Sequence, residues 1–144
     1  MNKNNKTTAV NSEKVERKWQ HIDAKDRVLG KLATEVSKAL IGKDKPNFSY
    51  RANVGDYVVV INTDKITVTG NKLRGKVFYR HSGYPKGLRS RTLEEALAKD
   101  PTKVLRNAVS GMLPQNKLKK VRLRNLKIYT GEEHPHKAQL SKSN

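Results

Sequence analysis

The chain has 144 residues, and its 31 lysines and arginines against 13 acidic residues give a formal net charge of +18 at pH 7. This length is typical of one domain that buries a core without covalent staples. A charge this far above the needs of solubility indicates a polyanionic partner, nucleic acid ahead of an anionic membrane surface. The absence of cysteine excludes disulfides, a thiolate zinc site and a cysteine nucleophile, and it fits a reducing compartment. No apolar run approaches the roughly 18 residues of a membrane span.

The first 18 residues predict a disordered basic tail. They are polar, low in apolar content, and carry five cations against two acids. A tail of this kind orders when it threads along RNA, and it lacks the apolar core of a secretory signal. We therefore expect a single domain over residues 19–139 and a short C-terminal tail over residues 140–144.

Two strands and a helix are predicted in the first half of the chain. Residues 19–23 alternate large and polar side chains, which is typical of a short strand. Apolar residues recur at helical spacing over residues 29–40, with Asp26 as the expected N-cap and Gly42 placed to end the helix. Residues 57–61 form an unbroken apolar run, which indicates a strand buried on both faces of a parallel sheet.

Charge and aromatic rings are concentrated in the basic segment, residues 70–91. It holds seven cations and no acidic residue. The rings among them are Phe78, Tyr79, His81 and Tyr84. Cations attract a phosphate backbone, rings stack on unpaired bases, and glycines let the main chain approach a bulky polyanion. A solvated basic loop is the alternative, but exposed rings are costly in water, and we predict nucleic-acid contact.

Residues 77–81, within the basic segment, are predicted as a strand, whereas residues 66–69 fit either a strand or a distorted helical turn. Thr92 and Glu95 then form a capping box for a short helix. The dipeptide Asp100-Pro101 begins the next helix, which Pro114 ends. The apolar face of this second helix consists of Val104, Leu105, Ala108, Val109 and Met112.

The remainder of the chain completes an alternating pattern. Residues 116–125 predict a basic helix or turn with Leu118 and Val121 on its buried side. Residues 127–130 predict the last strand, and the chain after Gly131 looks irregular. Helices that alternate with short apolar strands favour an α/β layer fold.

Other candidate sites have simpler explanations. The pair His134 and His136 beside two glutamates resembles a metal cluster, but the chain has no cysteine and a proline separates the histidines, so we predict no metal site. Asp56 and Asp64 flank the apolar run where catalytic acids occur in α/β proteins, and turn formation or capping explains them as well. His81 has no apparent catalytic partner, so we expect it to stack on RNA or to hydrogen-bond with it.

No sequence motif for catalysis is present. The chain has no Walker loop and no GxGxxG, GxSxG or HExxH motif. An RNA-modifying or nucleotide-using enzyme would need a cofactor loop or an acid–base pair, and neither is visible. A DNA-compacting basic protein, which would bind duplex DNA as well as RNA, is the other alternative. We therefore predict a binding protein with no cofactor, no small-molecule substrate and no membrane partner.

Four phrases of the sequence occur in a familiar order: TGNKL at 69–73, YRHSGYPKGL at 79–88, GMLP at 111–114 and LKIYTGEEHPH at 126–136. From Trp19 to Gln139 the chain resembles the bacterial-type ribosomal protein L13 (uL13) family. The resemblance implies a three-layer α/β/α sandwich around a small, mostly parallel four-stranded sheet, with a basic extended loop region.

The same resemblance implies a non-catalytic structural constituent of the large subunit of a cytoplasmic or organellar ribosome. Its partners would be large-subunit rRNA and neighbouring ribosomal proteins, with incorporation early in assembly. Members of the family can also bind messenger RNA and repress translation. We expect rRNA contacts, specific mainly for RNA shape, from cations and rings. The predicted residues are Lys43, Lys45, Lys72, Arg74, Lys76, Tyr79, Arg80, His81, Tyr84, Lys86, Arg89, Arg91, Lys117, Lys119, Lys120, Arg122 and Arg124.

Overall fold

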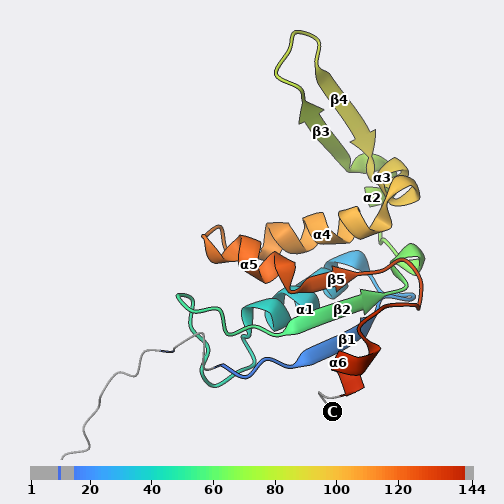
Figure 1. Ribbon diagram of the computed structural model, residues 1–144. Coiled ribbons are helices and arrows are strands. Elements are labelled where there is room, and N and C mark those ends of the chain that lie inside the picture. Colours follow the sequence, from blue (N-terminus) through green and yellow to red (C-terminus); the bar gives the residue numbers. More distant parts are fainter. Residues whose placement is uncertain (1–9, 11–14, 142–144) are drawn as a thin grey trace, which may run out of the picture.

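A three-stranded parallel sheet forms the centre of the protein (Figure 1). The structure is a computed structural model that describes residue 10 and residues 15–141. The sheet has the order β1-β2-β5, and β3 and β4 form a separate hairpin. The strands are β1 (Trp19–Asp23), β2 (Tyr57–Ile61), β3 (Val77–His81), β4 (Leu88–Thr92) and β5 (Leu126–Ile128). The helices are α1 (Leu29–Ile41), the short 3-10 helix η1 (Thr63–Lys65), α2 (Lys72–Gly75), α3 (Leu93–Lys99), α4 (Pro101–Met112), α5 (Leu118–Arg124) and α6 (Lys137–Ser141).

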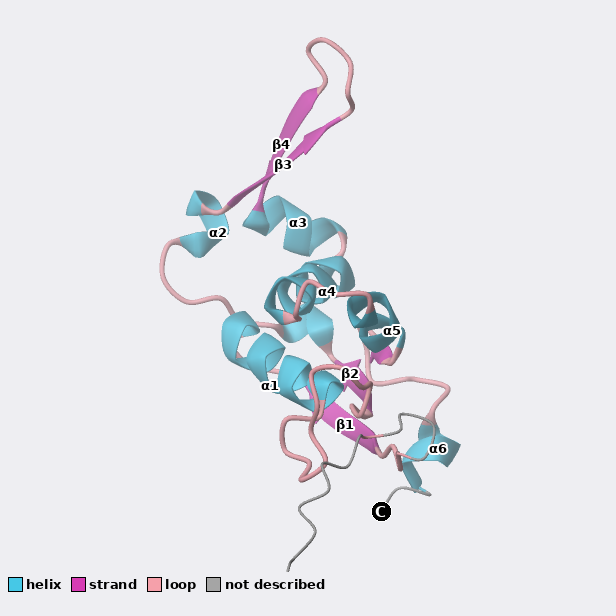
Figure 2. Ribbon diagram, turned by 90° about the vertical axis from the view of Figure 1, so that its left-hand side faces the viewer, coloured by secondary structure: helices cyan, strands magenta, loops and turns pink. Residues whose placement is uncertain are grey.

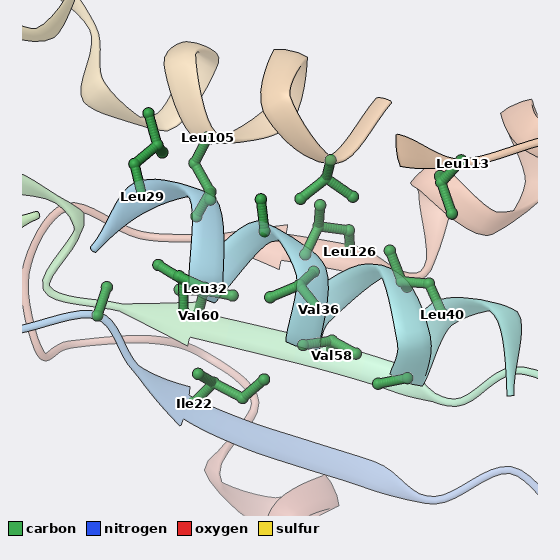
Figure 3. Packing of buried hydrophobic residues seen from close by; sticks show 14 of the residues in the cluster. Ile22, Leu29, Leu32, Val36, Leu40, Val58, Val60, Leu105, Leu113 and Leu126 are labelled. Carbon is green, nitrogen blue, oxygen red and sulfur yellow. The ribbon is translucent and has the colours of Figure 1, made fainter. Parts of the chain in front are cut away.

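The main hydrophobic core lies between the sheet and helices α1 and α4 (Figure 3). Leu32, Val36 and Leu40 of α1 are fully buried in one cluster with Val58 and Val60 of the central strand. Helix α4 packs on α1 and adds its own apolar face, so both helices lie on the same side of the sheet (Figure 2). Burying one such side chain contributes about 1.5–3 kcal/mol. Because several side chains of α4 are buried in this cluster, their burial holds α4 against α1.

The other face of the sheet is covered by the C-terminal segment, residues 131–141. Trp19 of β1 stacks on Tyr57 of β2 with ring centroids 4.7 Å apart, and the His136 ring lies 5.1 Å from the Trp19 ring. The Tyr129 hydroxyl and His136 Nε2 are 3.0 Å apart and share a hydrogen bond. Helix α6 packs against β1. The α/β class is therefore confirmed, with a layer on each face of a parallel sheet.

The expected four-stranded sheet is wrong in one respect. The strand predicted at residues 77–81 forms as β3, but it pairs with β4 in an antiparallel hairpin and not with the central sheet. The sheet consequently has three strands. Strand β3 carries a cation and polar rings and has no continuous apolar run, so the core offers it no favourable place.

The start of α1 also differs from the prediction. Asp26 has φ of +56° and lies before the N-cap, which is Val28. Leu29 N–H donates to the Thr67 carbonyl, and Thr67 N–H donates to the Arg27 carbonyl, at 3.0 Å each. The first bond satisfies the Leu29 N–H without a capping side chain, and residues 66–69 form a loop with one parallel bridge. The end of α1 is as predicted, since Gly42 adopts φ of +79° as the C-cap.

The capping signals around α3 and α4 are confirmed. The Thr92 hydroxyl accepts from Glu95 N–H, and the Glu95 carboxylate accepts from Thr92 N–H. The Asp100 carboxylate accepts from Lys103 N–H, and Pro101 occupies the first turn of α4. These caps fix where the chain leaves the hairpin and enters each of the two helices.

Two residues predicted to be buried are exposed instead. Met112 is 44% exposed, because α4 ends there and Leu113 takes the buried position after it. Val121 of α5 is also exposed, and Arg122 is buried in its place. The C-terminal segment, expected to be irregular, contains the short helix α6.

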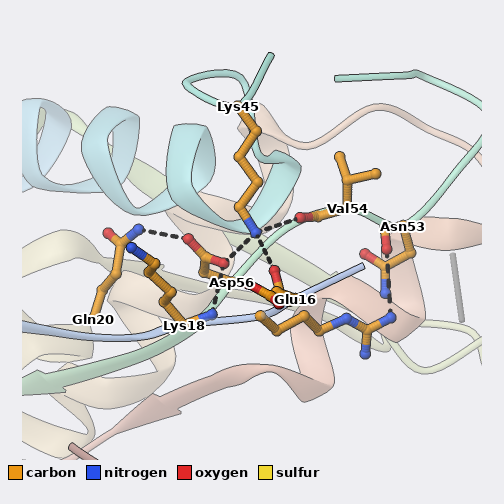
Figure 4. A network of polar contacts seen from close by, with 8 residues as sticks. Glu16, Lys18, Gln20, Lys45, Asn53, Val54 and Asp56 are labelled. Carbon is orange, nitrogen blue, oxygen red and sulfur yellow. Dashed lines mark hydrogen bonds and ion pairs between the residues drawn. The ribbon is translucent and has the colours of Figure 1, made fainter. Parts of the chain in front are cut away.

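A polar network around Asp56 ties the start of the chain to the sheet (Figure 4). The buried Asp56 carboxylate forms an ion pair with Lys45 and accepts from the Lys18 N–H at 3.0 Å and the Gln20 amide at 2.9 Å. Lys45 also donates to the Glu16 carbonyl at 3.0 Å. These contacts explain Asp56 as a structural acid, although it serves an ion pair and not the expected turn or helix cap.

The network includes residues 16–18, which precede the expected domain boundary at residue 19. Residues 16–18 make these contacts although the sequence assigns them to the tail. The rest of the predicted N-terminal tail, residues 1–9 and 11–14, lies outside the described residues, as do residues 142–144. Within the part of the chain that is described, no helix combines the length and the apolarity needed to cross a membrane.

Candidate nucleic-acid interface

The hairpin of β3 and β4 projects away from the body of the protein, beyond α2 and α3 (Figure 1). Its register places Arg80 opposite Arg89 and His81 opposite Leu88. The turn is closed by a hydrogen bond from Ser82 N–H to the Gly87 carbonyl, at 3.2 Å. The basic segment is therefore largely a defined, paired element and not a solvated loop.

The hairpin has two chemically different faces. Directly opposed residues of an antiparallel pair share a face, and neighbours along a strand alternate. One face, which we call the cationic face, carries Phe78, Arg80, Arg89 and Arg91. The other carries Val77, Tyr79, His81, Leu88, Ser90 and Thr92. The three arginines of the two strands therefore share one face, which suits contact with a phosphate backbone on that side.

The cationic face has no counter-charge of its own. Arg80 and Arg89 face each other directly, which is unfavourable for like charges on a strand pair. The ion pairs among the described residues join Arg27 to Glu35, Lys45 to Asp56 and Lys103 to Asp100, and none involves the hairpin. An external anion is thus the natural partner of this face.

A groove of about 650 Å³ runs between the cationic face and helices α3 and α4. Its hairpin side includes Arg80, Arg89 and Arg91, and its helix side adds Lys99 and Lys103. These five cations face one concave space. Such an arrangement concentrates positive potential where a chain of phosphates would lie.

One carboxylate, Asp100, also lines the groove. The hydrogen bond from the Thr102 hydroxyl, together with that from Lys103 N–H, lowers the pKa of Asp100 below its ordinary value, so it stays ionised. Its carboxylate caps the N-terminus of α4, and its Oδ2 lies 3.9 Å from Lys103 Nζ. The groove therefore keeps a clear cationic excess.

The rings of the hairpin are differently placed. Tyr79 and Tyr84 are 70% and 75% exposed, so both are open to stacking. Phe78 is half-buried against the core, with the Lys76 ammonium 5.4 Å from the centre of its ring. His81 Nδ1 accepts from Gly83 N–H at 2.9 Å, which leaves the ring proton on Nε2, facing away from the turn as a donor.

Most other predicted contact residues are accessible. Those that are exposed outside the groove are Lys43, Lys72, Arg74, Lys76, His81, Tyr84, Lys86, Lys117, Lys120 and Arg124. Lys119 is half-buried, and its ammonium donates to the Gln115 side chain at 2.9 Å. Lys72 and Arg74 lie on α2 at the base of the hairpin, close enough to extend its cationic surface.

Two of the predicted contact residues serve the fold instead. Arg122 is fully buried, burial lowers the pKa of its guanidinium, and its Nη2 donates to the Ala52 carbonyl at 3.4 Å. The prediction that Arg122 contacts phosphate is therefore wrong, because α5 turns this residue inward. Lys45 is held by Asp56 and by the Val54 carbonyl at 2.9 Å, so its charge is already compensated (Figure 4).

The groove also includes residues that were not predicted as contacts, among them Lys99, Lys103 and Asn107. These three come from helices outside the basic segment and face the hairpin only because α3 and α4 fold beside it. A signal was present for α4, since Lys103 and Asn107 are four residues apart and so share one face of that helix.

The fold and the groove define a small basic α/β protein whose surface suits a polyanion. The family model described as Ribosomal protein L13 matches residues 17–135. The relatives named large ribosomal subunit protein uL13 include those of Nitratidesulfovibrio vulgaris, 52% identical over 93% of this chain and 93% of the relative, and Thermotoga maritima, 50% identical over 93% and 90%. That of Symbiobacterium thermophilum is 49% identical over 94% of both chains.

The chain belongs to the ribosomal protein L13 family. It is a structural ribosomal protein of the large subunit and not an enzyme, as the sequence predicted. The alternative of an RNA-modifying or nucleotide-using enzyme is set aside.

Proposed function

We propose that the groove between the hairpin and helices α3 and α4 binds the sugar–phosphate backbone of large-subunit rRNA. The observation that carries the proposal is the direct opposition of Arg80 and Arg89, which face a groove also lined by Lys99 and Lys103. Only a polyanion brings enough negative charge to such a space. Binding in this groove would support early incorporation into the subunit.

The exposed rings add a second kind of contact. Tyr79 lines the groove and Tyr84 lies in the turn of the same hairpin, and both rings are exposed. Stacking of unpaired bases contributes about 1–3 kcal/mol per base. Affinity from the cations, and selectivity for looped or splayed RNA from the rings, would then come from one hairpin.

A titration against salt tests the electrostatic part of the proposal. If the surface meets about six to ten phosphates, affinity should fall about 10³–10⁵-fold between 50 and 200 mM salt. Filter binding to large-subunit rRNA fragments, beside an unrelated RNA and a duplex DNA of equal length, gives the comparison. Equal affinity for all three would favour the DNA-compacting alternative and overturn the proposal.

A matched pair of variants tests the site. We expect Arg80→Gln with Arg89→Gln to weaken rRNA binding and to leave the thermal unfolding midpoint unchanged, because both side chains are exposed. Lys31→Gln with Lys38→Gln removes the same charge from exposed positions on α1, outside the groove, and should retain most of the affinity. An equal loss in both pairs would show that net charge, and not the groove, governs binding.

In the host, the protein should travel with the large subunit in a sucrose gradient, in contact with rRNA and neighbouring ribosomal proteins. The proposal would be contradicted if the protein left the subunit in a high-salt wash and then bound duplex DNA. Repression of a messenger RNA would use the same groove, and it would be revealed by competition between that RNA and the rRNA fragment.

A further inference from the structure

A second cationic hollow lies at the free edge of the central sheet. Strand β5 pairs with β2 on one side only, so its other side is an edge. A hollow of about 310 Å³ opens there. Its lining consists of Arg106, Leu123, Arg124, Leu126, Lys127, Ile128 and Tyr129. Three cations and no acid therefore line this hollow.

These three cations are uncompensated. Within the part of the chain that is described, Arg106, Arg124 and Lys127 take part in none of the ion pairs and none of the side-chain hydrogen bonds. Arg106 and Arg124 are exposed and Lys127 is half-buried. Arg106 belongs to α4, Arg124 to the end of α5 and Lys127 to β5. The three side chains therefore line one space without an acidic partner.

The strand edge adds main-chain donors to this charge. Val58 N–H donates to the Asn125 carbonyl at 3.0 Å, and Tyr129 N–H donates to the Val60 carbonyl at 2.8 Å. The main-chain N–H and carbonyl groups of the odd-numbered residues along this stretch therefore point toward β2. By the alternation of a strand, the N–H groups of Leu126 and Ile128 point away from β2 toward the edge.

We infer that this hollow, the β5-edge site, binds the sugar–phosphate backbone of a further segment of RNA. Phosphate oxygens suit both the cations and outward N–H groups. An added peptide strand suits the edge less well, because β5 has only three residues and would offer few ladder bonds. The inference rests on the proposed function and adds a separate contact region to it.

Helix α4 connects the two regions. Lys103 and Asn107 line the hairpin groove, whereas Arg106 of the same helix lines the β5-edge site. Two RNA segments bound on adjacent sides of one rigid helix would be held at a fixed spacing. The protein would then act as a brace between parts of the folded rRNA.

Hydroxyl-radical footprinting of large-subunit rRNA with the full-length protein tests the inference. The wild type should protect two separate stretches. Arg106→Gln with Arg124→Gln should lose one stretch, Arg80→Gln with Arg89→Gln should lose the other, and Lys31→Gln with Lys38→Gln should lose neither. Removing two phosphate contacts should also reduce the slope of log affinity against log salt by about 1.8.

The outcomes separate the two ideas. If the Arg106/Arg124 pair keeps every protected stretch and the full salt slope, the β5-edge site is wrong and the groove proposal stands. The site is equally wrong if these variants bind RNA normally but lose a neighbouring protein from the subunit, since the partner is then a polypeptide. If the wild type protects no stretch of rRNA, the groove proposal is wrong, and the β5-edge inference that rests on it is wrong as well. Thermal unfolding of each variant should match that of the wild type, because all four arginines are exposed.

Discussion

Arg122 of α5 donates from Nη2 to the carbonyl oxygen of Ala52, 3.4 Å away, and joins the last helix before β5 to the loop before β2. Its Nε and Nη1 are buried and have no hydrogen-bond partner in the structure. A buried cation without an acid beside it costs stability, because desolvation is only partly repaid by one hydrogen bond.

Replacing Arg122 with methionine should therefore stabilise the protein. Methionine keeps most of the volume and removes the buried charge, and we expect the free energy of unfolding to rise by about 1 kcal/mol. Arg122→Ala should instead lower it by about 2–4 kcal/mol, since it leaves a cavity. Urea unfolding measures both, with the exposed Arg124→Met as a control that changes little. A large loss on Arg122→Met would mean that the guanidinium is needed for the fold.

Asp56 should be the most sensitive acidic residue of the polar network. Asp56→Ala removes the ion-pair partner of Lys45 and the acceptor for Lys18 N–H, and we expect a loss of about 3 kcal/mol in unfolding free energy. The exposed Asp64→Ala, just past the same strand, should change stability by less than about 0.5 kcal/mol. Equal effects at the two positions would contradict a structural role specific to Asp56.

The hairpin turn should depend on Gly87. A Cβ at this position would lie 2.1 Å from Ser82 Oγ and 2.8 Å from the Tyr84 carbonyl oxygen, so the turn must move. We expect Gly87→Ala to weaken rRNA binding with little change in the unfolding midpoint, because the hairpin lies outside the core. Gly111→Ala in α4 meets nothing within 4 Å and should stabilise the helix by about 0.5–1 kcal/mol without affecting binding. If Gly87→Ala binds rRNA as tightly as the wild type, the conformation of the turn is not needed for RNA contact.

Docking of the C-terminal segment should weaken in acid. Burial, and next to it the charges of His21, Lys137 and His136, lower the pKa of His134 below its ordinary value of 6.5. The unfolded chain then binds a proton more readily than the folded one, so stability is greatest above about pH 6.5 and falls as the pH decreases through that value. We expect a lower unfolding midpoint at pH 5.5 than at pH 8.

The variant His134→Gln checks the assignment of this pH dependence. It removes the titrating ring and should flatten the change in midpoint between pH 8 and pH 5.5. His136→Gln alters the neighbouring ring that contacts Trp19 and Tyr129, and so it should lower the midpoint at both pH values. An identical slope in His134→Gln and the wild type would place the titration elsewhere.

Features of the fold that depend on neighbouring residues were predictable. The apolar run at residues 57–61 forms the central strand, Gly42 ends α1, and the capping box at Thr92 begins α3. Each of these signals acts within a few residues of the backbone that it determines. Similarly, the resemblance of the chain to ribosomal protein L13 identified its family from phrases spread along its length.

Features that depend on distant segments were not predictable. Asp26 looked like a cap, but the loop at Thr67 supplies the hydrogen bonds at the start of α1. In a helix as short as α5, the apolar pattern does not fix which side turns inward, so Val121 and Arg122 exchanged their expected places. The hairpin groove needed α3 and α4 to fold beside the basic segment, and the local pattern of that segment does not contain this information.

The order of strands in the sheet affects how the chain folds during synthesis. Strand β2 receives one neighbour from earlier in the sequence and the other from Leu126–Ile128, and the ring of His136 lies against Trp19. A nascent chain that has emerged as far as α4 therefore still exposes one side of β2 and the rings of β1. Completion of the domain awaits β5 and the segment around His136, and a chain interrupted before β5 would present an unpaired strand edge that is prone to aggregation.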